Sequence, residues 1–177
     1  IHDLAIENYE KALWIFQHNG NQQEIYNIYN NMGTVYFAWG EFDKALAFFR
    51  QTLEHDKKNG HPENISVSYN NIGKVYYAWR NYEPAIEYFT EALDFAILSG
   101  NETLISTRLS NLGMVYFDTG KYDKALEMLS DALKLDSTNN NRLKVAIRQN
   151  ELGRVYAAKG NINKAKDFYE QALTTFH

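Results

Sequence analysis

The sequence predicts an all-α chain built from helix-turn-helix repeats, and two observations carry that prediction. A motif of the form Asn-x-Gly-x-Val-Tyr recurs at intervals of forty residues, starting at Asn31, Asn71, Asn111 and, with an acidic first residue, Glu151. Apolar residues inside each interval are spaced by three and four, as on one face of an α-helix. Since the register never slips, each interval is expected to form one pair of helices.

We expect the repeats to form a single array over residues 1–177. Residues 1–20 align with the second helix of later intervals, so they are expected to form a half-repeat. Four complete helix pairs are expected at 21–60, 61–100, 101–140 and 141–177, which makes nine helices. Because the chain begins with Ile1 and not with methionine, we expect it to be a piece of a longer protein.

Glycine marks most of the predicted helix ends, because it readily adopts the left-handed backbone that stops a helix. The turn inside each repeat falls at Gly40, Gly120 and Gly160, with Arg80 as the exception. The last junction between repeats, 137–141, has asparagines in place of glycine, and asparagine also tolerates positive φ.

Helix starts are marked by asparagine and proline. Asn21 with Glu24 resembles a capping box, in which each side chain caps the backbone of the other residue. Pro62 suits the first turn of a helix. Pro84 is expected in the first turn of a helix capped by Asn81, where its missing N–H costs nothing, so no kink is predicted.

Small residues at two repeat positions predict close helix packing. Gly33 and its equivalents are expected to face the column of Ala45, while Tyr36 and Phe49 fill the flanks. A bulky residue at Gly113 is therefore expected to destabilise the array. No repeat can bury its apolar face alone, so neighbouring repeats must stack.

The composition excludes several classes of partner. A net charge of −4 and a pI near 5.7 provide no basic surface for nucleic acid or for an anionic membrane. No apolar run approaches the roughly 18 residues that a membrane span needs. The absence of cysteine removes disulfides and thiolate chemistry. It fits a reducing cytoplasm, which we favour, and equally a periplasm, so the compartment stays open.

No chemistry of an enzyme is expected from the sequence. The histidines show no metal-binding spacing and are expected near helix ends, in solvent: His2, His18, His55, His61 and His177. There is no phosphate-binding loop and no nucleophile-elbow motif. We therefore expect no metal, no cofactor and no catalytic residue.

The third repeat carries the residues of a known signature: Leu112-Gly113-x-x-Tyr116, Gly120-x-Tyr122, Ala125, Leu129, Ala132 and Leu133. These positions resemble the tetratricopeptide repeat, and the match recurs four times over nearly the whole chain. The period exceeds the usual length of about thirty-four residues. It is similar to that of kinesin light chains, of spindle adaptors that bind G-protein regulators, and of the input regions of bacterial sensor kinases and transcription regulators. The resemblance implies a right-handed α-solenoid that acts as a binding scaffold.

In arrays of this kind the first helix of every repeat lines a concave groove, and this gives the candidate peptide-binding residues. By that resemblance they are Asn30, Asn31, Phe37, Asn70, Asn71, Lys74, Tyr77, Asn111, Met114, Phe117, Asn150 and Arg154. The wider wall of the groove is expected to add Asn27, Thr34, Val67, Thr107, Ser110, Asp118 and Ala157.

The recurring asparagines have two interpretations. Their amides can hydrogen-bond the backbone of an extended peptide, as asparagine ladders do in the kinesin light chains and spindle adaptors that the chain resembles. Alternatively, one asparagine of each pair bonds to the adjacent helix or faces water. Glu151 departs from the Asn31 column and interrupts the fourth rung of such a ladder.

Charged and aromatic positions of the wall also have two interpretations each. Lys74 and Arg154 match loosely a cationic clamp for a carboxylate, and are otherwise surface charges. Phe37, Tyr77 and Phe117 form a column that either grips apolar side chains of a ligand or belongs to the core.

Two tryptophans stand at the ends of first helices and receive no functional role. Trp39 and Trp79 are expected to pack against Phe42 and Tyr82, respectively, at the turn inside each repeat.

Two functions follow from the sequence as alternatives. The first is a module that binds a protein or peptide, as an adaptor or as the sensing part of a larger regulator. The second is an architectural array that associates with itself through apolar ends, at the unpaired first helix and near Phe176.

Overall fold

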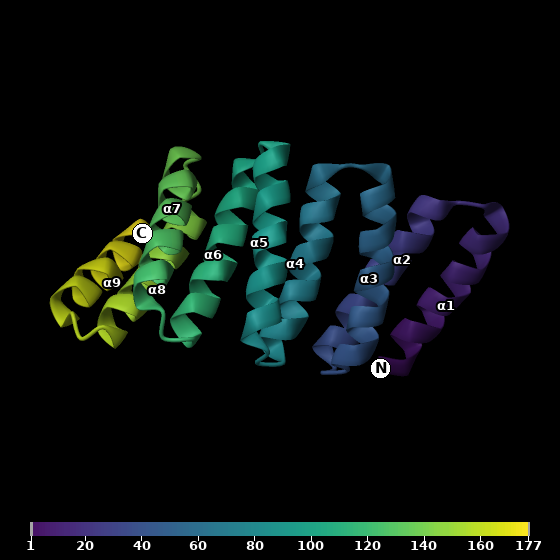
Figure 1. Cartoon of the computed structure of the whole chain (residues 1–177), viewed down its shortest axis with the longest axis horizontal. Helices are drawn as coiled ribbons and strands as arrows, with labels where there is room; N and C mark the ends of the chain where they lie inside the picture. Colours follow the sequence, from purple (N-terminus) through teal and green to yellow (C-terminus); the bar gives the residue numbers. More distant parts are fainter. Residues whose placement is uncertain (1, 177) are drawn as a thin grey trace. The chain divides into compact units, whose positions relative to one another are not determined.

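The computed structural model describes residues 2–176, without the side chains of residues 2, 3, 5 and 176, and this range forms nine α-helices and no strand. The helices are α1 (His2–Asn19), α2 (Gln22–Ala38), α3 (Phe42–Asn59), α4 (Pro62–Ala78), α5 (Tyr82–Ser99), α6 (Glu102–Asp118), α7 (Tyr122–Thr138), α8 (Arg142–Ala158) and α9 (Ile162–Phe176). Short turns join them, and consecutive helices run in opposite directions (Figure 1). None of the helices in the described range combines the length and apolar character needed to cross a bilayer.

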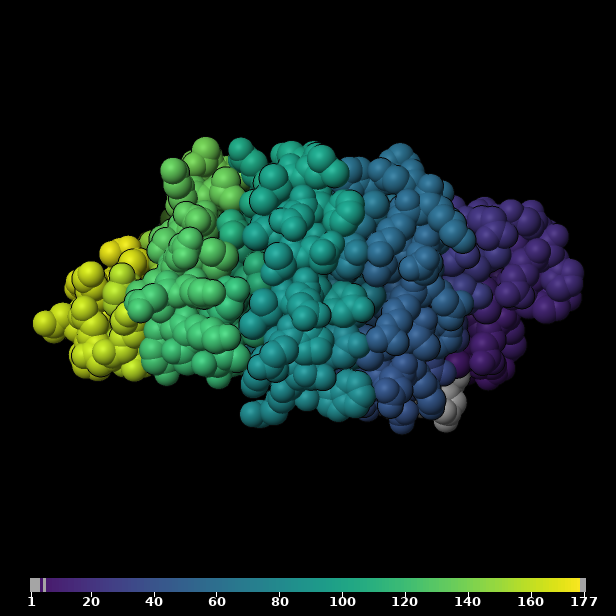
Figure 2. Space-filling view, in the orientation of Figure 1, coloured from purple at the N-terminus to yellow at the C-terminus, as the bar shows by residue number. Residues whose placement is uncertain are grey.

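The chain divides into two compact units, residues 1–88 and 89–177, and the division falls inside α5. In unit 1, α1 packs against α2, α2 against α3, and α3 against α4. In unit 2, α6 packs against α7, α7 against α8, and α8 against α9. Side chains close the spaces between neighbouring ribbons within each unit (Figure 2). One continuous array over 1–177 stays a prediction.

The first helices of the repeats (α2, α4, α6 and α8) start at strict intervals of forty residues, and so do the second helices (α3, α5, α7 and α9). An asparagine caps three of the first helices. The Asn21, Asn101 and Asn141 side chains accept backbone N–H bonds from the residue three positions later, at 3.1–3.3 Å. Pro84 lies in the first turn of α5, as expected, and the N–H of Ala85 bonds to the carbonyl of Asn81 at 3.2 Å.

The predicted capping box at Asn21 forms only in its first half. The Glu24 N–H donates to the Asn21 side chain, but the Glu24 carboxylate accepts from Asn27 at 3.3 Å. The backbone N–H of Asn21 is already bonded to the carbonyl of Phe16 at 3.1 Å, which leaves no donor for Glu24. The second half of that prediction was wrong.

Arg80 adopts the left-handed backbone that glycine adopts at the same turn elsewhere. Its φ is 59°, against 76°, 73° and 78° at Gly40, Gly120 and Gly160. Asn140 likewise has a φ of 52° at the last junction. A side chain with a Cβ is strained in this region by roughly 1–2 kcal/mol, so the geometry of the turn is imposed on Arg80 by the helices on either side.

The glycines of the first helices are packed against one residue of the following helix. A Cβ on Gly33 would lie 2.7 Å from Phe49, and on Gly113 it would lie 2.7 Å from Cγ of Leu129. The expected contact with the alanine column is present at Gly113, where a Cβ would lie 3.5 Å from the carbonyl of Ala125, but at Gly33 the nearest atoms belong to Phe49, which was expected at the flank. The Phe49 side chain itself covers the glycine, because it lies one helical turn beyond Ala45 on the same face.

The core of each unit is a continuous apolar layer between its helices. In unit 1, Ala45, Phe49, Ile72 and Val75 are at most 3% exposed. In unit 2, Ala125, Leu129, Leu152 and Val155 form one buried cluster, with Tyr116 and Leu133 packed against it. The buried positions are those of the repeat motif, so the period that predicts the helices also predicts the core.

Arg80→Gly is expected to stabilise the protein by about 1 kcal/mol, because glycine removes the steric strain of a Cβ at positive φ. Arg80→Ala is the matched control, since it removes the same charge but keeps the Cβ. Urea denaturation of both variants measures the difference. An equal gain in the alanine variant would mean that the charge, and not the backbone, is responsible.

Gly113→Val is expected to lower the free energy of unfolding by about 2–3 kcal/mol, because the added carbons overlap with the fully buried Leu129. Glu127→Ala, at an exposed position of α7, provides the control. Urea denaturation again gives the measurement. A Gly113→Val protein as stable as the control would show that α6 and α7 are not held at this distance.

Candidate functional site

A polar pocket of about 210 Å³ opens between α2, α3 and α4 in unit 1. It is lined by Gln23, Tyr26, Asn27, Asn30, Thr52, Asp56, Asn64, Val67 and Ser68. The first helices α2 and α4 provide its walls, and the C-terminal half of α3 provides Thr52 and Asp56. Three of the residues that the sequence places on the wall of the groove, Asn27, Asn30 and Val67, therefore line a real cavity.

A buried carboxylate lies in this pocket. Asp56 is 6% exposed, and its Oδ2 accepts a hydrogen bond of 2.5 Å from the hydroxyl of Ser68. The other oxygen, Oδ1, lies 3.6 Å from Nδ1 of His55. The His55 ring stacks on Tyr26 with the ring centres 3.8 Å apart. A carboxylate with so little water around it favours a cation as its neighbour.

Unit 2 has a carboxylate at the equivalent position, but there a guanidinium covers it. Asp136 is 2% exposed, and its Oδ2 accepts from Nε of Arg148 at 3.1 Å. Nη1 of Arg148 also donates to Ser110 at 2.7 Å and to Glu151 at 3.0 Å. This group of four residues forms a closed network between α6, α7 and α8. Its members satisfy one another's hydrogen-bonding groups.

A second cationic side chain lies beside this network. Nζ of Lys144 donates to the carbonyl of Thr103 at 3.3 Å and to the hydroxyl of Thr107 at 3.0 Å. Burial lowers the pKa of Lys144, and the charges of Arg148 and Arg108 act in the same direction, against Asp136. Burial also lowers the pKa of Arg108 to about 10. The first helices of unit 2 therefore hold three cations close together.

The asparagine column is used partly inside the protein. In unit 1, Nδ2 of Asn71 donates to Oδ1 of Asn30 at 2.9 Å, from one first helix to the next. At the equivalent positions of unit 2, Ser110 donates to Glu151 at 3.1 Å. Glu151, which breaks the asparagine column in the sequence, is thus the acceptor of the neighbouring helix.

The remaining predicted amides differ in their access to solvent. Asn31 and Asn150 are exposed, Asn111 is half-buried together with Met114, and Asn70 is only 3% exposed. The two exposed amides are open to a ligand on the face of the first helices. The binding roles of these residues stay predictions.

The aromatic column is half-buried, and each ring packs across the turn of its own repeat. Phe37 contacts Phe42 with ring centres 6.2 Å apart, and Tyr77 contacts Tyr82 at 6.1 Å. Phe117 contacts Tyr122 at 6.0 Å. Each ring is therefore partly packed inside its own repeat and partly accessible to solvent.

Trp79 has a neighbour that the sequence did not predict. It packs against Phe42 of the preceding repeat, with ring centres 5.7 Å apart. Trp39 makes an edge contact with Tyr36, at 5.4 Å. Phe42 and Trp79 come together because they lie at the same end of two neighbouring helix pairs.

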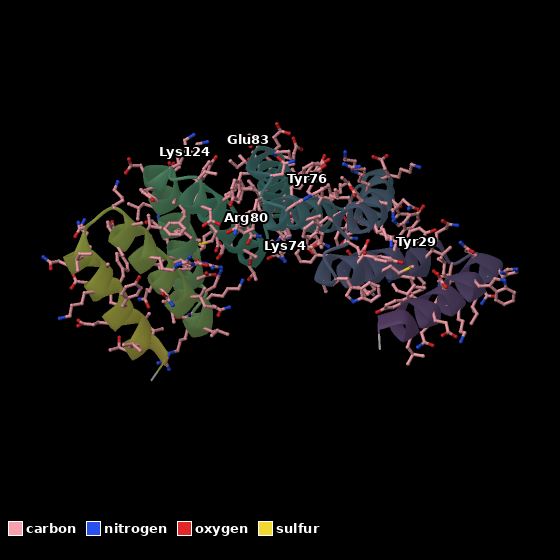
Figure 3. The ribbon with its side chains drawn as sticks, turned by 90° about the horizontal axis from the view of Figure 1, so that it is seen from below. Tyr29, Lys74, Tyr76, Arg80, Glu83 and Lys124 are labelled. Atoms are coloured by element: carbon pink, nitrogen blue, oxygen red, sulfur yellow. The ribbon has the colours of Figure 1, made fainter. Side chains whose placement is uncertain are left out.

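The two cations of the predicted clamp belong to different units. Lys74, in unit 1, is exposed, and in Figure 3 it projects from the side of α4 opposite to Tyr76. Two residues apart on a helix lie about 200° apart, which accounts for this arrangement. The guanidinium of Arg154, in unit 2, lies 4.9 Å from the centre of the Phe117 ring, a cation–π contact.

The expectation of solvent-exposed histidines fails at His55. Its side chain is 12% exposed, because the ring lies between Tyr26 and the neighbouring Asp56. His18 and His61 are exposed as expected, and the side chains of His2 and His177 lie outside the described residues. Among the side chains that the structure describes, no three His, Asp or Glu residues are grouped in a way that would hold a metal ion.

Sequence reasoning missed four buried charged residues: Asp56, Arg108, Asp136 and Arg148. A signal was present, because residues 16, 56, 96 and 136 share one repeat position and alternate between apolar side chains and aspartate. Position 148 belongs to a column that reads Ile28, Ser68 and Arg108 in the earlier repeats. A charged residue at a repeat position that elsewhere holds apolar residues, as aspartate does at positions 56 and 136, predicts a buried polar contact.

Comparison with known proteins agrees with this architecture. The family model described as tetratricopeptide repeat matches residues 2–58, 24–97 and 104–176. No curated protein matches the sequence. The family match and the helix order confirm both the predicted resemblance and the predicted fold class, an all-α solenoid of such repeats.

Several solved structures are similar to the chain. BtubC (BKLC) from P. vanneervenii has a TM-score of 0.85 at 26% identity, over 98% of this chain and 72% of that one. A putative kinesin light chain of Podosopora anserina, with nearly identical TPR-like repeats, has a TM-score of 0.79 at 18% identity, over 98% and 92% of the two chains. A Rap protein complexed with Competence and Sporulation Factor has a TM-score of 0.83 at 18% identity, over 98% of this chain and 49% of that one.

Asp136→Asn is expected to lower the free energy of unfolding by about 3 kcal/mol, because it leaves the charge of Arg148 buried with one partner fewer. Asp56→Asn is the matched variant in unit 1, where the partner is the neutral Ser68, and it is expected to cost about 1 kcal/mol. Urea denaturation of both proteins tests the difference. Equal costs would contradict a buried ion pair in unit 2.

Proposed function

The chain belongs to the tetratricopeptide repeat family, and from that premise we propose that its first helices bind a polypeptide. The observation that carries the proposal is the polar pocket of unit 1, which opens on α2 and α4 and is lined by amide side chains. The chain is then a scaffold and not an enzyme, and its partner is a protein or a peptide. It serves as the interaction or sensing part of a larger regulatory protein.

Amides suit the recognition of a backbone because each one both donates and accepts hydrogen bonds. Gln23, Asn27, Asn30 and Asn64 surround the pocket on two sides. The bonds that Asn27 makes to its own helix are long, 3.3 and 3.4 Å, so a ligand can replace them at little cost. Asn31 adds a further exposed amide on α2.

The similar structures support the proposal at the level of the fold. The Rap protein is complexed with Competence and Sporulation Factor, so a related helical array accommodates a ligand. At 18% identity the likeness shows the fold alone. The chemistry of the ligand must therefore come from the residues of this chain.

Self-association is the second candidate function, and exposed apolar side chains on α1 favour it. Leu4, Trp14 and Ile15 are 48–62% exposed. Light scattering over a range of concentrations separates the two candidates. A protein that is monomeric and binds peptides supports the scaffold. A protein that forms oligomers, which the substitution Trp14→Gln converts to monomers, supports self-association.

Peptides are first selected from a random twelve-residue library on the immobilised protein. Their affinity is expected to fall about thirtyfold for the double variant Asn27→Ala/Asn64→Ala, because about 1 kcal/mol is lost with each hydrogen-bonding amide. Both residues are exposed and line the pocket, so the fold is expected to remain intact. Isothermal titration calorimetry gives the affinities.

Asn163→Ala, an exposed asparagine on α9, is the control and is expected to bind like the unmodified protein. A library from which no peptide is enriched would contradict the proposed function. So would peptides that bind the double variant as tightly as the unmodified protein.

A further inference from the structure

A buried aspartate occurs at the same repeat position in both units, but its hydrogen-bond partner differs. Asp56 and Asp136 are separated by two periods of the repeat, and both carboxylates are buried. In each unit the partner lies twelve residues further along the chain, on the next first helix. That partner is Ser68 in unit 1 and Arg148 in unit 2.

The difference in side-chain length explains the pocket. In unit 2 the guanidinium of Arg148 and the ammonium of Lys144 occupy the space beside Asp136 and between the first helices. Their equivalents in unit 1 are Ser68 and Asn64, and both line the pocket of about 210 Å³. One water needs roughly 10–15 Å³ of a cavity measured in this way, so the pocket has room for a guanidinium group and the end of the chain that carries it.

The chemistry around the pocket matches such a group. Asp56 lines the pocket and provides the negative charge, and Ser68 reaches one of its two oxygens. The ring of Tyr26 also lines the pocket, and a planar guanidinium stacks on aromatic rings more readily than an ammonium does. The side-chain oxygens of Asn27, Asn30 and Asn64 can accept the remaining N–H groups.

We propose that this pocket binds an arginine side chain of the polypeptide partner, which takes the place that Arg148 occupies in unit 2. The proposal rests on the proposed function and adds to it the identity of one recognised side chain. It makes the carboxylate of Asp56 the specificity-determining group, and the amides around it the groups that orient the guanidinium.

The test uses Nα-acetyl-arginine N-methylamide as the probe and NMR titration of the ¹⁵N-labelled chain as the measurement. Saturable shifts are expected at the backbone amides of Asn27, Asn64 and Val67. The citrulline analogue, which has the same shape and no charge, is expected to bind at least about tenfold more weakly. An arginine probe that causes no shifts, or a citrulline probe that binds equally well, would overturn the proposal.

Ser68→Arg is the decisive variant, because it provides unit 1 with the side chain that fills the equivalent site in unit 2. It is expected to abolish binding of the probe. Ser130→Arg adds the same charge at an exposed position of α7 and is expected to leave binding unchanged. Binding that survives Ser68→Arg would overturn the proposal.

Asp56→Asn keeps the size of the side chain and provides a second test if Ser68→Arg fails to fold. A loss of about tenfold in affinity for the arginine probe is expected, because the hydrogen bonds lose a charged partner. An unchanged affinity would overturn the arginine site.

Failure of the arginine site can be distinguished from failure of the proposed peptide-binding function. Peptides from the library that bind through the amides of α2 and α4, but whose arginines can be replaced by citrulline without loss, would remove the arginine site and leave the scaffold in place. Binding of the arginine probe without any enriched peptide would leave the pocket in place and remove the scaffold.

Discussion

The structure depends on how closely the two helices of a repeat approach each other. Each first helix buries one face against the second helix, and a glycine on that face receives a side chain from the partner: Phe49 on Gly33, Leu129 on Gly113 and Tyr169 on Gly153. Because these contacts recur at the same repeat position, the two helices of each of these pairs are in contact at the same point along their length. The interiors of proteins are close-packed, so a change at one of these points shifts both helices.

That fixed spacing also determines which polar residues meet. Within unit 1 the bond from Asn71 to Asn30 joins residues forty-one apart, and within unit 2 the bond from Ser110 to Glu151 joins residues at the same separation. The buried carboxylates follow the same rule, each with a partner twelve residues later. A polar residue on a first helix therefore has a predictable neighbour, and its chemistry depends on which residue occupies that neighbouring position.

The sequence predicts the helices and the core well because both depend on local periodicity. The turns at Gly40 and Gly120, the asparagine caps and the buried positions of the motif all follow from spacing within one repeat. Arg80 shows how strongly the period dominates, since it adopts a glycine conformation at the position where the register requires a turn. Contacts with a neighbouring helix or repeat were predicted less well. Trp79 packs on Phe42 of the preceding repeat, and His55 is covered by Tyr26 of the preceding helix.

The candidate site could be located only in part for the same physical reason. The resemblance places amides on the first helices, but a cavity depends on the lengths of the side chains that meet between helices. Ser68 and Arg148 occupy the same repeat position, but serine has a short hydroxyl side chain whereas arginine has a long one that ends in a guanidinium. In unit 2 the Arg148 side chain pairs with the buried carboxylate of Asp136. In unit 1 no such side chain is present at that position, and the carboxylate of Asp56 lines a pocket. The residue at this one repeat position therefore decides whether the buried carboxylate has a cation beside it, as in unit 2, or lines a pocket, as in unit 1.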